Sequence, residues 1–299
     1  YGKSIVCRLA EMNRFFIAKG LTEIEISKPV FQEWVSLKSN EAFSTQEKRY
    51  IAIHCFAKFL ILNGYKNIYI QENPVIKKDS GFIPYIYSED EIQRLFRAAD
   101  HFTTDKKAYA YDHSTMLPVL LRLLYSTGLR ISEALGLRLR DVEFQRGNIM
   151  IWDSKNHVSR MVSVSASLIN VLRKYREKLH FVDENNFLFQ GYNGSPYSYT
   201  AVNNVFHKVL NDAGISRRAS GKLPRIHDLR HVFAIRALEQ MQTKGYDLYT
   251  SLPLLSKYLG HKSIVETEYY IRLTQSSFSQ ITRTADSYSP DLFPSLAGE

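Results

Sequence analysis

The stretch from residue 223 to residue 270 limits the possible folds most, because short helical patterns alternate in it with residues that end helices. Pro224 stops any preceding helix, and the run after it has helical composition. Leucines recur at three- and four-residue spacing over residues 252–259, and Gly260 then ends this second helix. A capping-box pattern at residues 263–266 predicts another helix start. We therefore expect three short helices with tight connections.

Polar residues lie at the ends of these predicted helices. His227 and Arg230 are three residues apart, so their side chains share one edge of the first helix. His261 directly follows the second helix, and Tyr269 and Tyr270 lie in the third. Adjacent helical residues point about 100° apart, so only one tyrosine faces a given site. Taken singly, each residue has an ordinary structural interpretation, since the chain has 19 tyrosines and most helical histidines are not catalytic.

Another polar pair lies further upstream, in the string TGLRISE. Gly128 interrupts a helical pattern there, Arg130 begins the next helix, and Glu133 lies three residues on. The carboxylate could hold the guanidinium for catalysis, although the pair alone would suggest a plain salt bridge. Three β-prone segments within residues 142–165 then predict a small antiparallel sheet, with Lys155 in a hairpin turn.

These strings together resemble the active-site half of the tyrosine recombinase (phage integrase) family. The matching strings are TGLRISE, HDLRH, LGHKSI and a tyrosine nine residues after the histidine of LGHKSI. That count selects the second of the two adjacent tyrosines as the nucleophile. The resemblance is strong over residues 85–275, although the turn around Lys155 lacks the family's glycine-rich pattern. It implies a catalytic set of Arg130, Lys155, His227, Arg230, His261 and Tyr270, supported by Glu133.

The implied chemistry needs positive charge, because the oxygens of a phosphodiester are anionic. Arg130 and Arg230 suit this role, since a guanidinium fork matches two phosphate oxygens and keeps its proton near neutral pH. By the resemblance, Tyr270 forms a 3′-phosphotyrosyl link and Lys155 protonates the leaving 5′ oxygen. The first histidine of the set takes the phenolic proton or bonds the phosphate, and the second bonds a phosphoryl oxygen. Neither a metal ion nor another cofactor is implied.

Other candidate residues have no comparable motif. We assign no catalytic role to the remaining histidines, which are His54, His101, His113, His157, His180, His207 and His231. The only cysteines, Cys7 and Cys55, are too few for a disulfide framework and belong to no metal-spaced cluster. We therefore expect two free thiols and no metal site.

The first part of the chain predicts a separate helical domain. Helical patterns over residues 1–78 end at glycines and resemble, in outline, the SAM-like core-binding domain of the family. A capping pattern at residues 44–47 puts Lys48 and Arg49 near the first turn of the longest helix. Basic side chains and backbone N–H groups could bind DNA phosphates together there. A helical domain without DNA contacts would show the same pattern.

We therefore predict a mainly α-helical protein with a small antiparallel β-sheet. Its parts are a helical core DNA-binding domain (1–78), a linker (79–87), a mixed α/β tyrosine recombinase catalytic domain (88–283) and a C-terminal tail (284–299). The tail is broken by prolines but keeps apolar residues, and we expect it to pack on a neighbouring protomer. Because the sequence begins without methionine, we expect a trimmed or processed chain.

Charge favours a polyanionic partner. Lys and Arg total 39 against 30 Asp and Glu, a net charge of +9. Both parts are basic, with 12 − 8 = +4 through Pro84 and 27 − 22 = +5 beyond it, so they could clamp one DNA duplex. A basic loop ahead of His227 either binds backbone phosphates or is an ordinary charged loop; its residues are Arg217, Arg218, Lys222 and Arg225.

The sequence thus predicts a site-specific DNA recombinase or integrase that exchanges strands through a Holliday junction. We expect a homotetramer on double-stranded DNA, one dimer per site, which an accessory DNA-bending or directionality protein could assist. The alternatives are a type IB topoisomerase and a catalytically silent DNA-binding protein. No apolar run reaches the ~18 residues that span a membrane, and a signal-peptide pattern is lacking. We expect a cytoplasmic, nucleoid-associated bacterial protein.

Overall fold

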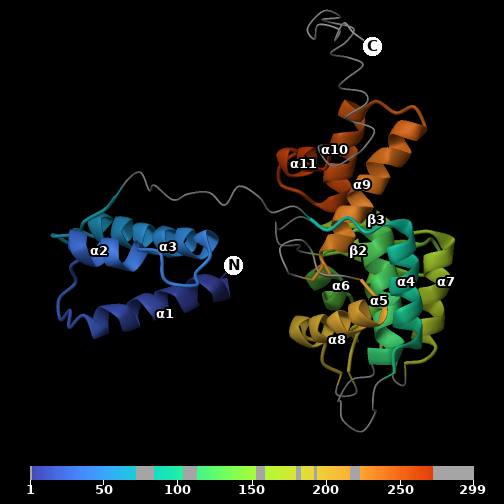
Figure 1. Ribbon diagram of the computed structural model, residues 1–299, viewed down its shortest axis with the longest axis horizontal. Coiled ribbons are helices and arrows are strands. Elements are labelled where there is room, and N and C mark those ends of the chain that lie inside the picture. The colour runs from blue at the N-terminus through green and yellow to red at the C-terminus, as the bar shows by residue number, and fades with distance from the viewer. Residues whose placement is uncertain are drawn as a thin grey trace, which may run out of the picture. The chain divides into compact units, whose positions relative to one another are not determined.

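The computed structural model describes residues 2–71, 84–103, 113–152, 159–179, 183–191, 194–215 and 223–271. The chain divides into two compact units, Tyr1–Ile83 and Pro84–Glu299. This division falls inside the segment 79–87, which the sequence predicts as a linker. As predicted, the described residues are mainly helical with one small antiparallel sheet (Figure 1). Within them, no helix is long and apolar enough to cross a membrane.

The described part of the N-terminal unit is a small helical bundle. Its helices are α1 (Gly2–Ala18), α2 (Lys28–Val35) and α3 (Phe43–Leu62). Both α1 and α2 pack against α3, and the side chains of Phe31, Trp34 and Ile53 are buried between them. A parallel β-bridge between Ile26 and Ile68 joins the segment before α2 to the segment after α3.

Helix α3 begins earlier than its capping pattern predicts. Ala42 is the N-cap residue, and its carbonyl accepts hydrogen bonds from two backbone N–H groups of the first turn, at 2.8 and 3.2 Å. Ser44 therefore lies inside the first turn and does not cap it. Lys48 and Arg49 consequently lie beyond the first turn, where backbone N–H groups already have helical partners.

Helix α5 (His113–Thr127) forms the centre of the second unit. Its neighbours include α4 (Glu89–His101), α7 (Ala166–Arg176) and α8 (Tyr199–Asp212). Because helices pack on several sides of α5, leucines all around it are buried, among them Leu117, Leu120 and Leu123. This central position explains why most of the surface of α5 is apolar, while Arg122 on its outer side pairs with Asp100.

A small sheet follows the short helix α6. The elements in this region are α6 (Ile131–Gly136), the 3-10 helix η1 (Leu139–Asp141), β1 (Val142–Glu143), β2 (Asn148–Ile151) and β3 (Arg160–Ser163). The strands are antiparallel, as predicted, and their order in the sheet is β1-β2-β3. Ile149 pairs with Val162, and both are buried against the core. Ile151 pairs with Arg160 at the end of the hairpin. Lys155 lies outside the described residues.

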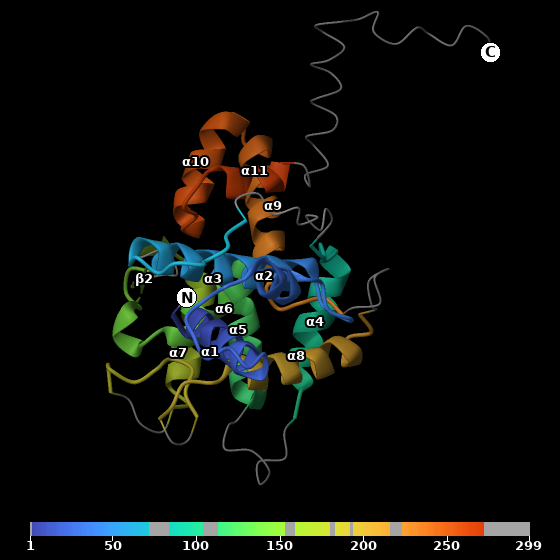
Figure 2. The same cartoon turned by 90° about the vertical axis from the view of Figure 1, so that its left-hand side faces the viewer.

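The last described helices correspond to the three predicted from the stretch 223–270. They are α9 (Asp228–Thr243), α10 (Leu248–Leu259) and α11 (Val265–Ile271). All three pack against one another and lie together at one end of the unit (Figures 1 and 2). Helix α9 also packs against α5, so the start of α9 lies beside the junction of α5 and α6. The predicted polar residues lie at these helix ends.

Candidate active site

The junction between α5 and α6 needs a glycine at position 128. Gly128 has a φ of +61°, in the left-handed region that L side chains rarely adopt. A Cβ atom here would overlap the ring of Phe233 and lie 3.0 Å from Leu259 Cδ2. Because glycine has no Cβ, the end of α5 can approach α9 and α10 closely.

Arg230 links this junction to α10. It lies in the first turn of α9 and is 2% exposed. Its Nη1 donates to the carbonyl of Gly128 and its Nη2 to the carbonyl of Leu259, both at 2.7 Å. Burial, together with the charge of Arg130, lowers the pKa of Arg230 to about 10, so the guanidinium stays protonated at neutral pH. Both carbonyl partners are uncharged and leave its positive charge available to an anion.

Glu133 holds two guanidinium groups in place. Arg130 Nη1 donates to Glu133 Oε1 at 2.9 Å, while Arg160 donates to both carboxylate oxygens, at 3.1 and 2.8 Å. Burial raises the pKa of Glu133, but hydrogen bonds from Arg160 and Arg130 and the charge of Arg160 outweigh this effect and lower the pKa below its ordinary value. One carboxylate between two guanidinium groups leaves a net positive charge.

The carbonyl groups at the end of α10 orient the same two arginines. Arg130 Nη2 donates to the carbonyl of Gly260 at 3.2 Å, and Arg160 Nε donates to the carbonyl of Tyr258 at 2.8 Å. Gly260 has a φ of +69°, and a Cβ there would lie 2.9 Å from Arg160 Nη1. Glycine is therefore favoured here, because any other residue would be strained at this φ and would displace the guanidinium; the turn directs the chain toward His261.

His261 lies at the start of the connection to α11. Its Nδ1 is 2.8 Å from Thr267 Oγ1, which orients the ring. Burial and the charges of Arg230 and Arg130 lower the pKa of His261 to about 3. The imidazole is therefore neutral at neutral pH and can bond a phosphoryl oxygen through its other nitrogen only if that nitrogen carries the ring proton.

Tyr270 brings a phenol into this cluster from α11. Its side chain is 3% exposed, whereas the neighbouring Tyr269 is half-buried. The Tyr270 ring is nearly parallel to that of His261, with centroids 6.3 Å apart, and its Oη is 3.0 Å from His231 Nδ1. Burial raises the pKa of Tyr270, although the charge and hydrogen bonding of Arg230 oppose the rise. The phenol is therefore protonated at neutral pH.

His227 completes the cluster as the N-cap residue of α9. Its ring lies edge-on to that of His231, with centroids 5.1 Å apart. Burial and the charges of Arg230 and Arg225 lower the pKa of His227 to about 4, so it is neutral at neutral pH. The structure thus gathers these residues of the predicted set: Arg130, His227, Arg230, His261 and Tyr270. Lys155 lies outside the described residues.

Two members of this cluster, Arg160 and His231, were not predicted from the sequence. Arg160 belongs to no motif, because it lies within a β-prone segment where every second residue faces outward. His231 ends the HDLRH string, yet we assigned it no role. The available signal was its spacing of four residues from His227, which puts both imidazoles on one face of a helix.

The prediction that Arg49 contacts DNA is wrong. Arg49 is 1% exposed, and its guanidinium forms an ion pair with Glu41. It also donates to the carbonyl groups of Trp34 and Ser36. Its charge is thus neutralised inside the N-terminal unit, where no phosphate can reach it. Lys48, the preceding residue, is exposed.

The remaining DNA-contact candidates precede α9. The side chain of Arg225 is 45% exposed, and its Nη2 is 3.1 Å from a carboxylate oxygen of the buried Asp228. This ion pair anchors Arg225 beside the cluster without removing it from solvent. The other candidates, Arg217, Arg218 and Lys222, lie outside the described residues.

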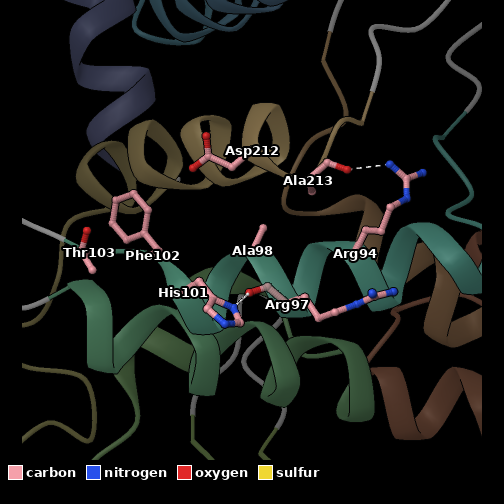
Figure 3. A pocket seen from close by; sticks show the side chains of 8 residues that line it. All are labelled: Arg94, Arg97, Ala98, His101, Phe102, Thr103, Asp212 and Ala213. Carbon is pink, nitrogen blue, oxygen red and sulfur yellow. Dashed lines mark hydrogen bonds between the residues drawn. The ribbon is translucent and has the colours of Figure 1, made fainter.

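A separate cavity of about 480 Å³ lies between α4 and α8 and contains none of the cluster residues (Figure 3). Arg94 Nη1 donates to the carbonyl of Ala213 at 2.6 Å, and His101 Nδ1 is 2.8 Å from the carbonyl of Arg97. Because backbone carbonyls hold these basic groups, we assign the cavity to helix packing. Elsewhere in the described ranges, no group of three or more His, Cys, Asp or Glu side chains could hold a metal ion.

Comparison with known proteins identifies relatives of the chain. The model of the phage integrase family matches residues 86–277, more than half of the chain. The "Putative integrase/recombinase y4rB" of Sinorhizobium fredii is 33% identical over 196 residues, which are 63% of this chain and 61% of that protein. Tyrosine recombinase XerC of Halalkalibacterium halodurans is 28% identical over 255 residues, 81% of this chain and 76% of that protein. The match thus spans less than two thirds of the y4rB protein.

Solved structures show the same fold. The XerH site-specific recombinase bound to its palindromic difH substrate superposes with a TM-score of 0.65 at 20% identity, covering 93% of this chain and 76% of that one. A lambda integrase dimer bound to a COC′ core site gives a TM-score of 0.66 at 18% identity, covering 90% and 88%. The shared fold and the family match over most of the second unit agree with the clustered arginines, histidines and tyrosine, and the chain belongs to the phage integrase family.

Proposed function

We propose that this protein is a site-specific DNA recombinase or integrase that cuts and rejoins strands through a 3′-phosphotyrosyl intermediate. The observation that carries the proposal is a buried phenol, that of Tyr270, between cations and neutral imidazoles. Arg230 of α9 and Arg130, the residue that precedes α6, both act electrostatically on this phenol. Such a group can attack a phosphodiester and store the bond energy in a covalent link.

The positive charge acts on the phosphate. As Tyr270 attacks, negative charge grows on the phosphoryl oxygens, and fixed cations stabilise this charge without reorganising. Arg230 is held by backbone carbonyls and Arg130 by Glu133 and the Gly260 carbonyl, so both guanidinium groups are oriented before DNA binds. Such preorganisation is the largest contribution we assign to these residues.

The covalent step is a substitution at phosphorus. A bond forms between Tyr270 Oη and phosphorus while the bond to the 5′ oxygen breaks. The phenolic proton passes to a neighbouring base, and the leaving 5′ oxygen takes a proton from Lys155, as the family resemblance implies. Reversal by a 5′ hydroxyl of another strand rejoins the DNA and releases Tyr270. Strand exchange therefore needs no net input of bond energy.

We propose double-stranded DNA as the partner, bound by a homotetramer with one dimer at each site. The net charge of +9 supports a polyanionic partner. The XerH and lambda integrase structures contain DNA, and the latter is a dimer on its core site. Packing of the tail 284–299 on a neighbouring protomer, an accessory protein and a bacterial cytoplasmic location stay predictions; the tail lies outside the described residues.

The two alternatives receive less support. The curated relatives are named as integrases and recombinases, which favours recombination over simple relaxation of supercoils by a type IB topoisomerase. A catalytically silent DNA-binding protein would have no reason to keep Arg230 and Tyr270 buried in one group. Burying a cation is costly, and such groups are more frequent at functional sites.

A suicide substrate tests the proposal. The probe is a pool of DNA duplexes with a randomised core. Each duplex has a nick close to the cleavage site, so that cleavage releases a short fragment. Loss of the fragment carries away the 5′ hydroxyl, so the strand cannot be resealed and the protein stays covalently attached. We expect an SDS-resistant adduct with the wild-type protein and none with Tyr270→Phe.

Tyr269→Phe is the matched control, because it removes a hydroxyl from the adjacent residue of the same helix. We expect this variant to form the adduct as wild type does. An adduct that persists in Tyr270→Phe and disappears in Tyr269→Phe would show that Tyr269, and not Tyr270, is the nucleophile. Absence of any adduct from the wild-type protein across the pool would count against strand cleavage altogether.

A further inference from the structure

His231 lies closer to the reacting oxygen than its sequence context suggests. Its Nδ1 is 3.0 Å from Tyr270 Oη, a distance typical of a direct hydrogen bond. The contact joins α9 to α11 across 39 residues of sequence. Both ends are held by their helices, since Tyr270 is almost fully buried and the rings of the pair have centroids 5.6 Å apart.

We propose that His231 is a further catalytic residue, which holds the neutral phenol of Tyr270 and takes its proton when Tyr270 attacks phosphorus. This inference rests on the proposed strand cleavage. The proton moves from Tyr270 Oη to His231 Nδ1 as the Oη–phosphorus bond forms and the bond to the 5′ oxygen breaks. The leaving oxygen takes a different proton, from Lys155. In the rejoining step the His231 imidazolium returns its proton to the departing phenolate.

The surroundings keep His231 in the base form before DNA binds. Burial and then the charge of His227 lower the pKa of His231 to about 4, with smaller effects of Arg225 and Arg230 in the same direction and of Asp228 in the opposite one. At neutral pH the imidazole therefore has an unprotonated nitrogen. The titratable and charged groups around it are His227, Arg225, Asp228 and Arg230 near the start of α9, His261 after α10, and Tyr270 of α11.

The resting pair does not exchange its proton, because the pKa of Tyr270 is raised while that of His231 is lowered. Two changes reverse this balance during the reaction. A bound phosphodiester brings a negative charge that favours the imidazolium. Bond formation to phosphorus makes the phenolic oxygen far more acidic, so the proton leaves as attack proceeds. Premature ionisation of the nucleophile is thereby avoided.

This arrangement gives the two neighbouring imidazoles, those of His227 and His231, different roles. His227 and His231 are four residues apart, and their rings meet edge to face with centroids 5.1 Å apart. Of these two imidazoles, that of His231 lies within hydrogen-bond distance of Tyr270 Oη. His227 can then bond the phosphate, which is one of the two roles that the family resemblance leaves open for it.

The decisive variant is His231→Asn. The Asn side-chain oxygen is as many bonds from Cα as His Nδ1, so it can still accept the phenolic hydrogen bond, but it cannot take a proton near neutral pH. We expect single-turnover adduct formation on the suicide substrate to slow by about 10²–10⁴-fold, the usual contribution of a proton-transfer group. DNA binding in a gel-shift assay and the unfolding temperature should stay at wild-type values.

A bridging 5′-phosphorothiolate substrate separates proton acceptance by His231 from protonation of the leaving group by Lys155. Its sulfur leaves as a thiolate and needs no proton, so we expect the substrate to restore cleavage in Lys155→Ala but not in His231→Asn. His101→Asn is the matched control, because His101 is exposed and lies outside the cluster. If the Asn variant is less stable than wild type, His231→Gln provides a second neutral side chain for the same comparison.

The outcomes are distinguishable. Cleavage by His231→Asn within about 3-fold of wild type, against the larger loss expected of a proton acceptor, would mean that hydrogen bonding alone is needed and would overturn the proposal. Rescue of His231→Asn by the sulfur substrate would likewise overturn it, since the defect would then lie in leaving-group protonation. Failure of the wild-type protein to form any adduct would instead contradict the proposed function.

Discussion

Substitution of Glu133 by Gln should destabilise the second unit strongly. The Glu133 side chain is 5% exposed, and it binds the guanidinium groups of Arg130 and Arg160, which are 15% and 7% exposed. It also accepts the backbone N–H of Arg130 at 2.9 Å. A glutamine keeps one oxygen but turns an N–H₂ group toward donors, and it leaves two buried cations without a counter-charge.

The expected loss follows from this burial. Breaking a buried ion pair by removing one partner costs about 3–5 kcal/mol. For a domain of 150–250 residues, each kcal/mol shifts the unfolding temperature by roughly 2–4 °C, so Glu133→Gln should lower it by about 6–20 °C. Adduct formation should also slow about 10²-fold, because Arg130 loses the group that orients it.

The same variant makes a pH prediction. The pKa of Glu133 in the folded protein lies below its ordinary value of 4.5, so its carboxylate contributes stability above that pH. The contribution is lost as the pH falls through the folded-state pKa. Thermal unfolding followed by circular dichroism should therefore show a large wild-type advantage over Glu133→Gln at neutral pH, which narrows below about pH 4.5.

Glu143→Gln is the matched control for this prediction. Glu143 also forms an ion pair three residues away, with Arg146 at 3.3 Å, but the two side chains are 45% and 78% exposed. Such surface pairs contribute about 0–1 kcal/mol. Equal unfolding temperatures for Glu133→Gln and Glu143→Gln would refute the reasoning, because they would show that the buried carboxylate does not hold the two arginines.

Two further predictions concern packing and charge. Gly128→Ala should lower the unfolding temperature more than Gly245→Ala. Both glycines have positive φ, but of the two only position 128 would bring a Cβ into the Phe233 ring, so thermal unfolding should show an extra cost of about 1–3 kcal/mol there. Equal shifts in the two variants would exclude a close approach at Gly128. Arg49→Ala should unfold the N-terminal unit by removing a buried ion-pair partner, whereas Lys48→Ala should leave stability unchanged and weaken DNA binding at low salt. Circular dichroism checks the stability of the two variants, and salt-dependent gel shifts check their DNA binding. A stable Arg49→Ala variant that binds DNA weakly would show that Arg49 contacts DNA after all.

Features set by neighbouring residues were predictable from the sequence. Ser88 and Glu91 have capping-box spacing, and in the structure Glu91 N donates to Ser88 Oγ at 3.2 Å while Ser88 N donates to Glu91 Oε2 at 2.9 Å. Gly260 ends α10 in the left-handed conformation expected of a helix stop. The antiparallel strands also formed where β-prone segments alternate with turns. Each of these depends on contacts within a few residues, which spacing encodes directly.

The local sequence pattern was misleading where another nearby residue provides the hydrogen bond or the ion pair. The spacing of Ser44 and Glu47 resembles a capping box, but the carbonyl of Ala42 accepts the first helical hydrogen bonds and α3 begins before Ser44. Lys48 and Arg49 look equivalent in the sequence, yet one is exposed and the other is buried. The difference depends on Glu41, which folds back to pair with Arg49.

The sequence by itself determined which residues share a helix edge or end a helix, and its motifs named most of the site. Only the tertiary structure decided which partners those residues meet: Glu133 bonds Arg160 across 27 residues, and His231 bonds Tyr270 across 39. The physical reason is that a hydrogen bond forms only within about 3 Å, and helices distant in the chain reach that separation through the packing of the whole core.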